Sequence, residues 1–202
     1  MRPVVISILA LLLFQQQDMS LLLDHATPPS RPFATVATGV SVVEVEVDGR
    51  TRSMQTRQLY GKSPFVTPGL NALMSWGFSV PQGVPSARTS VTFLFRSPAI
   101  YSVSITPPAV QPWAGSPNIS ALPQEIVDPG YPPTSVAEGI LVLTLRINTE
   151  GNVIGVEKFS GEAVLFEQAR LALKNWKFSS ARIANKPVSS TAYVVISFVR
   201  PT

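Results

Sequence analysis

The sequence contains no cysteine, a single histidine and few charged residues. The absence of cysteine excludes disulfides, a catalytic thiol and a thiolate metal site. The one histidine, His25, has no companion at metal-ligand spacing and no partners for a histidine-dependent triad. Because it stands in a polar stretch before two prolines, we expect it to be a solvated linker residue. These absences predict a protein that is not an enzyme and that uses neither a cofactor nor a metal ion.

Charge is sparse as well as scattered. Charged residues make up 14% of the chain, against the ~25% typical of soluble domains, and the net charge is +4. The basic residues occur singly, without an arginine-rich run or zinc-finger spacing, so no nucleic-acid partner is predicted. Glu44 and Glu46 share one face of a predicted strand, which we interpret as a solvated face rather than an acid–base pair. The 45% hydrophobic content is enough for a packed core.

The chain also lacks a long hydrophobic run. The apolar residues 4–14 fit the core of a signal peptide and fall short of the ~20 residues that a spanning helix needs. Joined to the leucines at 21–23, they would instead make a short, poor membrane anchor. Both interpretations export the rest of the chain to the periplasm. We therefore expect residues 1–30 to be a signal peptide or an N-terminal anchor outside the fold.

An internal repeat with an offset of about 100 residues organises the remainder. The clearest matches are Gly39 with Gly139, Gly61 with Gly161, Trp76 with Trp176 and Phe78 with Phe178. In each copy, alternating apolar residues over 43–47 and 141–147 predict a strand with one buried face. Return strands are expected at 50–60 and 152–159, after a two-residue Asp48-Gly49 turn in the first copy.

The hydrophobic period then becomes helical in both copies. Leu165, Ala169, Leu173 and Trp176 fall on one helix face, so the second helix is expected to end on the Trp-x-Phe sequence. In the first copy Thr67 is the expected N-cap, with a proline at the first helical position. Final strands follow at 89–95 and 191–199. Trp76 and Trp176, at the ends of the two predicted helices, are both expected in the core.

Each copy is therefore predicted to be a β-β-α-β unit. The fold class is α+β, with two tandem units, each a three-stranded antiparallel sheet with one helix on one face. The expected units are a degenerate copy at 31–98 and a better-preserved copy at 125–202. A Pro-rich linker is expected at 99–124.

The last strand of the second copy is the predicted partner-binding edge. Its second face, formed by Tyr193, Val195, Ser197 and Val199, is more apolar than the corresponding face of the first copy. Edge strands offer unpaired N–H and C=O groups to which a partner segment can add. Two explanations stay open: this face packs on the other copy, or a partner peptide adds there.

An ordered set of short motifs in the second copy resembles the C-terminal domain of TonB-type energy transducers. The motifs are Tyr131-Pro132, Gly139, Gly151-Asn152-Val153, Ser160-Gly161, Trp176-Lys177-Phe178, Pro187-Val188 and the closing strand Val195 to Phe198. The resemblance covers residues 125–200, and the copy at 31–98 shares it only through the repeat. Tyr131, Pro132, Gly161, Trp176 and Phe178 form its structural signature.

The resemblance implies a periplasmic protein that binds a peptide of an outer-membrane receptor or envelope protein by strand addition, linked to energised transport. The chain departs from the family in its short apolar run without a histidine and in its missing long spacer, which argues against an inner-membrane motor as a partner. The alternative is a structural envelope scaffold in which the two copies, or two chains in a homodimer, pair with each other and no peptide is bound.

Overall fold

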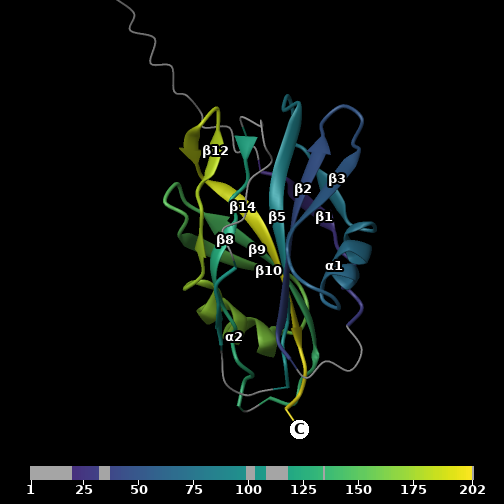
Figure 1. Ribbon diagram of the computed structural model, residues 1–202, viewed down its shortest axis with the longest axis vertical. Helices are drawn as coiled ribbons and strands as arrows, with labels where there is room; N and C mark the ends of the chain where they lie inside the picture. The colour runs from purple at the N-terminus through teal and green to yellow at the C-terminus, as the bar shows by residue number, and fades with distance from the viewer. Residues whose placement is uncertain (1–19, 32–36, 99–102, 108–117, 134, 202) are drawn as a thin grey trace, which may run out of the picture.

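The computed structural model describes residues 20–31, 37–98, 103–107, 118–133 and 135–201 (Figure 1). Of these residues, 48% lie in strands and 12% in helices. The helices are α1 (Val66–Leu73) and α2 (Ala163–Leu173). The strands are β1 (Leu22–His25), β2 (Gly39–Asp48), β3 (Met54–Tyr60), β4 (Gly77–Ser79), β5 (Ser86–Phe95), β6 (Ser104–Ile105), β7 (Asn118–Ile119), β8 (Pro123–Val127), β9 (Gly139–Ile147), β10 (Val153–Ser160), β11 (Lys177–Phe178), β12 (Ala181–Ile183), β13 (Lys186–Val188) and β14 (Ser190–Phe198).

A six-stranded sheet forms the centre of the fold, in the order β10-β9-β14-β5-β2-β3. Strands β2, β3 and β5 are mutually antiparallel, and so are β9, β10 and β14. The two sets join where β5 and β14 run parallel, with Val91 opposite Tyr193 and Phe95 opposite Ser197. The prediction of two three-stranded units with one helix each is therefore wrong. Three strands and a helix bury little apolar surface, and continuing the sheet across both copies buries more.

Three small sheets flank the central one among the described residues. They have the orders β1-β4, β11-β8-β6 and β13-β12-β7. The first two occupy corresponding places in the repeat, because β4 and β11 each follow the helix of their copy directly.

The two helices pack on opposite faces of the central sheet. Successive residues of a strand point to opposite faces, and the core residues of the sheet divide accordingly. Leu143 of β9 lies in the core under α2, whereas Val43 of β2 lies in the core under α1. Each core crosses the junction, since Leu94 of β5 joins the α2 core and Val195 of β14 joins the α1 core. Neither copy therefore has a core of its own.

The helices differ in detail from the sequence prediction. They end at Leu73 and Leu173, and each Trp-x-Phe sequence leads into a short strand, β4 or β11, instead of closing the helix. In α1 the N-cap position is Phe65, so Thr67 lies within the first turn and is not the cap. Trp76 and Trp176 are both buried, as predicted.

Gly69, a poor helix former inside α1, is explained by packing. A Cβ at this position would lie 2.8 Å from a ring carbon of Phe93 on the sheet. The glycine lets the helix backbone approach β5 closely, and this close contact outweighs a helix-propensity loss of about 1 kcal/mol.

Two segments that we expected outside the folded units are part of the fold. Residues 20–25, predicted to belong to the leader, include β1, which pairs with β4. Residues 118–124, predicted to be linker, include β7 and the start of β8, which pairs with β11. The rest of the predicted leader, residues 1–19, lies outside the described residues.

The same two segments also reach across to the opposite half. The carbonyl oxygen of Leu21 accepts a hydrogen bond from Tyr193 Oη at 2.6 Å. The carbonyl oxygen of Ala121 accepts one from Ser90 Oγ at 2.7 Å. Each copy thus supplies a segment that covers the sheet of the other, and the two halves are interlocked.

The tryptophans tie these segments to the helices in the same way in both copies. Trp76 Nε1 donates to the Thr27 carbonyl oxygen, and Trp176 Nε1 donates to the Val127 carbonyl oxygen, both at 2.8 Å. Donors and acceptors are each 100 residues apart, so the first copy begins upstream of its predicted start at residue 31.

Truncation tests whether residues 20–26 belong to the fold. A chain starting at Ser20 should unfold at the urea concentration of the full chain. A chain starting at Thr27 should lose at least about 3 kcal/mol, because it lacks the fully buried Leu21 and leaves Tyr193 Oη without its acceptor. Leu21→Ala is the point-variant control and should cost about 2–5 kcal/mol. Equal midpoints for both truncations would show that β1 contributes nothing.

Candidate functional site

The predicted binding strand lies in the middle of the sheet and not at an edge. β14 pairs with β9 on one side and with β5 on the other. Tyr193, Val195 and Ser197 are at most 3% exposed, and Val199 follows the end of the strand. The prediction that these residues form an open edge is therefore wrong. Their apolar face belongs to the α1 core, so packing on the other copy is the explanation that holds.

The residues of the predicted structural signature serve the core around α2. Tyr131, Trp176 and Phe178 all belong to that core, and the rings of the last two stack with centroids 6.3 Å apart. Pro132 is buried beside them. Gly161 has φ +109°, and a Cβ there would lie 2.5 Å from the Ile140 carbonyl oxygen, so only glycine fits without strain.

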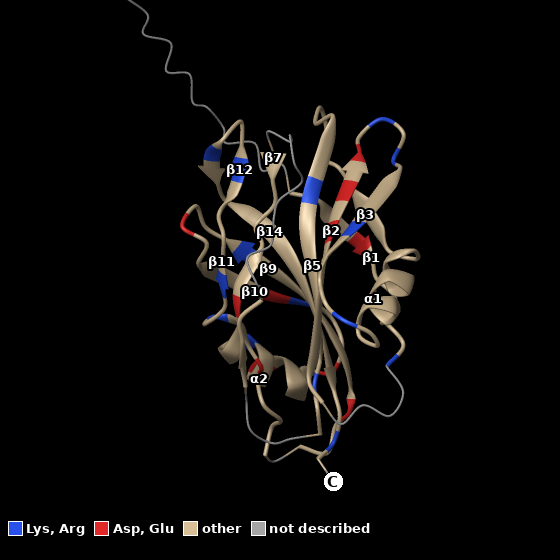
Figure 2. Cartoon of the chain, in the orientation of Figure 1, with Lys and Arg blue, Asp and Glu red and all other residues tan. Residues whose placement is uncertain are grey.

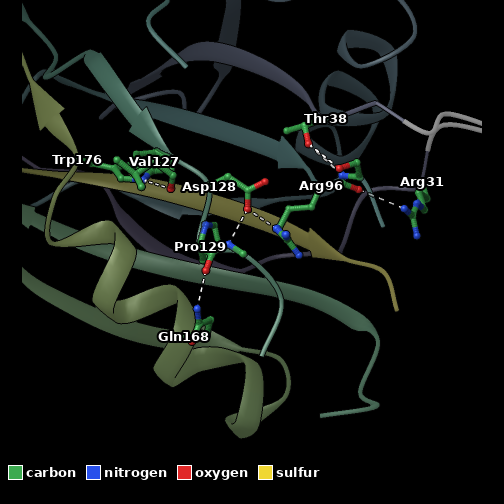
Figure 3. Close-up of polar contacts among 10 residues, drawn as sticks. Arg31, Thr38, Arg96, Val127, Asp128, Pro129, Gln168 and Trp176 are labelled. Carbon is green, nitrogen blue, oxygen red and sulfur yellow. Dashed lines mark hydrogen bonds and ion pairs between the residues drawn. The ribbon is translucent and has the colours of Figure 1, made fainter. Parts of the chain in front are cut away.

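A buried ion pair fixes the segment before Tyr131 to the first half. Arg96 Nε donates to Asp128 Oδ1, and both side chains are at most 1% exposed (Figure 3). The backbone N–H of Gly130 donates to the same oxygen at 2.9 Å, and the guanidinium carbon of Arg96 lies 5.2 Å from the ring centre of Phe198. These charges hold the turn in place and are shielded from solvent.

Glu44 does not lie on a solvated face, which corrects the sequence interpretation. Its side chain is 1% exposed, and its carboxylate accepts a hydrogen bond from Ser120 Oγ at 2.6 Å. Arg57 lies 3.4 Å from the other carboxylate oxygen, and the neighbouring Glu46 pairs with Arg88 at 2.8 Å. Figure 2 shows these acidic residues of β2 between basic residues of the flanking strands. The segment around Ser120 covers this face of the sheet.

The outer edges of the central sheet are β3 and β10. Within the described residues, each pairs with another strand of this sheet on one side only. β3 reads Met-Gln-Thr-Arg-Gln-Leu-Tyr and presents mainly polar side chains. β10 reads Val-Ile-Gly-Val-Glu-Lys-Phe-Ser, and its register shifts near both ends. Such irregularities and charges are the usual protection of an edge strand.

Exposed apolar side chains gather on β10 and the helix that follows it. The large exposed apolar residues of the described chain are Leu22, Met74, Val103, Val136, Ile154, Phe159, Val164 and Leu171. Ile154 is 60% exposed and Phe159 39%, both on β10, while Val164 and Leu171 lie on α2. Sequence reasoning missed Ile154 and Phe159. The signal was the broken alternation of β10, where apolar residues occur on both faces.

The turn between β2 and β3 is longer than the two-residue turn expected at Asp48-Gly49. Val47 pairs with Met54, so six residues connect the paired positions. Asp48 Oδ1 accepts hydrogen bonds from the backbone N–H groups of Thr51 at 2.7 Å and Arg50 at 2.8 Å. These two bonds lower the pKa of Asp48, and the bond from Thr51 has the larger effect. An Asx-type turn therefore replaces the tight hairpin turn.

The described part of the chain shows neither a metal-ion cluster nor a membrane-spanning helix. It has no group of three or more His, Cys, Asp or Glu side chains that could hold a metal ion. None of its helices is long and apolar enough to cross a membrane. His25 is exposed, as expected, but it pairs with Gly77 as part of β1 and is not in a linker.

Comparison of the chain with protein-family models, with curated proteins and with solved structures gave no match.

Proposed function

We propose that the protein is a non-enzymatic periplasmic binding protein that captures an extended peptide segment of an outer-membrane receptor or another envelope protein by strand addition along β10. The observation that supports this most directly is the exposure of Ile154 and Phe159 on a strand that, among the described residues, pairs on one side only. The binding edge is β10 and not β14, because β14 has neighbours on both sides.

Strand addition needs two things that β10 offers. Unpaired backbone groups along an outer strand provide hydrogen bonds for affinity, and alternate side-chain positions provide specificity. The eight residues of β10 are long enough to pair with a peptide of similar length. Ile154 and Phe159 would contact apolar side chains of that peptide. β3 is the poorer candidate because it has no large exposed apolar residue.

The periplasmic location in this proposal rests on the apolar residues 4–14 and on the resemblance to TonB-type domains. The resemblance also supplies the partner class, an envelope protein with an extended segment. We leave energised transport and an inner-membrane motor out of the proposal, because the chain lacks the anchor histidine and the long spacer that such transducers have.

The test uses peptides selected by phage display on the purified full chain. The best peptide should bind with micromolar affinity, and it should slow amide hydrogen exchange at residues 153–160. The variant Ile154→Glu/Phe159→Glu should weaken binding at least about tenfold, which is about 1.4 kcal/mol. The matched control Gln55→Glu/Gln58→Glu adds the same charges to β3 and should bind as the wild type does.

Two outcomes would overturn this proposal. One is that selected peptides bind both double variants and the wild type equally. The other is that exchange slows along β3 and not along β10. The four substituted side chains are all exposed, so neither double variant is expected to unfold the protein. Urea denaturation of each variant checks this.

One observation favours a second candidate, an envelope scaffold that binds no peptide. The strands β5 and β14, where the two copies meet, already pair with each other, so neither offers an open edge at this junction. If no peptide is selected and the purified chain instead self-associates through β10, so that Ile154→Glu/Phe159→Glu dissociates the oligomer in analytical ultracentrifugation, the scaffold is the better account.

A further inference from the structure

The first copy contains a cleft at a place where, among the described residues, the second copy joins its hairpin turn to β11. It lies between the β2–β3 turn and β4, and its volume is about 140 Å³. Since one ordered water occupies roughly 10–15 Å³ of such space, the cleft has room for roughly ten non-hydrogen atoms. The lining residues are Asp24, Val47, Gly49, Arg52, Phe78, Ser79 and Val80.

The second copy closes the same place with its own residues. There Asn152, at the end of the hairpin turn, bridges to Lys177 of β11, and Lys177 Nζ donates to Asn152 Oδ1 at 2.9 Å. The backbone N–H of Phe178 also donates to the Gly151 carbonyl oxygen at 3.0 Å. These contacts join the hairpin turn to the small sheet beneath it.

The residues one repeat earlier are not joined in this way within the described chain. Gly77 stands where the second copy has Lys177, and it has no side chain to reach the turn. The β2–β3 turn is instead bonded to the segment before β5, where the N–H of Gly49 donates to the Pro85 carbonyl oxygen at 2.8 Å. In the described chain β4 pairs only with β1, so its other side borders the cleft with unpaired backbone groups.

The walls of the cleft carry both signs of charge above an apolar floor. Asp24 is held on the β1 side, where its Oδ1 accepts a hydrogen bond from Ser79 Oγ at 3.0 Å. Arg52 lines the cleft from the turn side, and within the described residues no ion pair joins it to Asp24. Phe78, which is partly exposed, provides most of the apolar surface above the buried Val47, and it is fixed by its ring contacts with Trp76 and Tyr193.

We infer that this cleft binds a small apolar zwitterion of the amino-acid or dipeptide class. The ligand's ammonium group would pair with Asp24, its carboxylate with Arg52, and its side chain would lie on Val47 and Phe78. Charge-assisted hydrogen bonds to both ends select a molecule that carries both charges. Leucine and dialanine have the size that the cleft admits. The site is separate from β10 and does not depend on peptide capture there.

The experiment is a titration of the ¹⁵N-labelled full chain with leucine and with dialanine, followed by amide chemical shifts. Saturable shifts are expected at Gly49 and at residues 78–80, with a dissociation constant in the millimolar range or below. Leucinamide, which lacks the carboxylate, and N-acetylleucine, which lacks the ammonium group, should each bind about tenfold more weakly. Whichever of leucine and dialanine binds more tightly separates a free amino acid from a dipeptide.

Two variants assign the charges, and a third serves as the control. Arg52→Ala should abolish the preference for leucine over leucinamide, and Asp24→Asn should abolish the preference for leucine over N-acetylleucine. Lys177→Ala, at the closed position of the second copy, should leave all three affinities unchanged. Because each readout is a ratio within one variant, a modest loss of stability does not obscure it. Unsaturable shifts with both ligands, or ratios that neither variant changes, would overturn the inference.

Discussion

Replacing Arg96 with methionine is expected to destabilise the protein by about 3–5 kcal/mol, one of the largest effects of any single substitution in this chain. The reason is that Asp128, at most 1% exposed, would keep a buried charge without its partner. The turn would also lose a fixed point, because the same carboxylate oxygen holds the Gly130 N–H. Urea denaturation followed by far-UV circular dichroism measures the loss.

A double-mutant cycle shows whether the loss comes from the pair. Arg96→Met/Asp128→Leu should be more stable than either single variant, since it leaves no unpaired charge inside the protein. Arg170→Ala, which breaks a partly exposed pair with Glu167 on α2, is the matched control and should cost at most about 1 kcal/mol. If Arg96→Met costs no more than this control, the buried pair does not stabilise the fold.

The strands and the repeat could be predicted from the sequence because they rest on local patterns. Alternating apolar residues over 43–47 and 141–147 do form β2 and β9, and the final strands appear close to their expected bounds. An alternation of apolar and polar residues indicates that one face of a strand is covered. It does not record which element covers it, and so the alternation alone cannot place β5 beside β14.

What the sequence could not provide were contacts between distant segments. The apolar face of Val195 and Tyr193 must pack against something, and its sequence fits a partner peptide and the other copy equally well. The burial of Glu44 depends on Ser120, which is distant in sequence and lies in a segment that proline content marked as a linker. The exposed pair on β10 was harder still, because the broken alternation resembles that of a strand buried on both faces.

The repeat makes a stronger prediction about folding, which the two tryptophans test. Trp176→Ala and Trp76→Ala should each cost about 3–5 kcal/mol, the usual loss for a large buried aromatic residue. Trp176→Phe and Trp76→Phe keep most of the packing and remove only the Nε1 hydrogen bond to Val127 or Thr27. They should cost about 1 kcal/mol each, because one partly buried hydrogen bond is lost.

The decisive outcome is the shape of the unfolding curve and not only its midpoint. Trp76 lies in the α1 core and Trp176 in the α2 core, but Val195 and Leu94 carry each core across the β5–β14 junction. Loss of either tryptophan should therefore shift one common transition, with far-UV circular dichroism and amide exchange of both halves moving together. Two separate transitions in Trp76→Ala, with β9 and β10 still protected while β2 and β3 exchange, would mean that the second copy folds without the first. In that case the pairing of β5 with β14 would be a contact between two domains, and β14 could present an edge when the first copy opens.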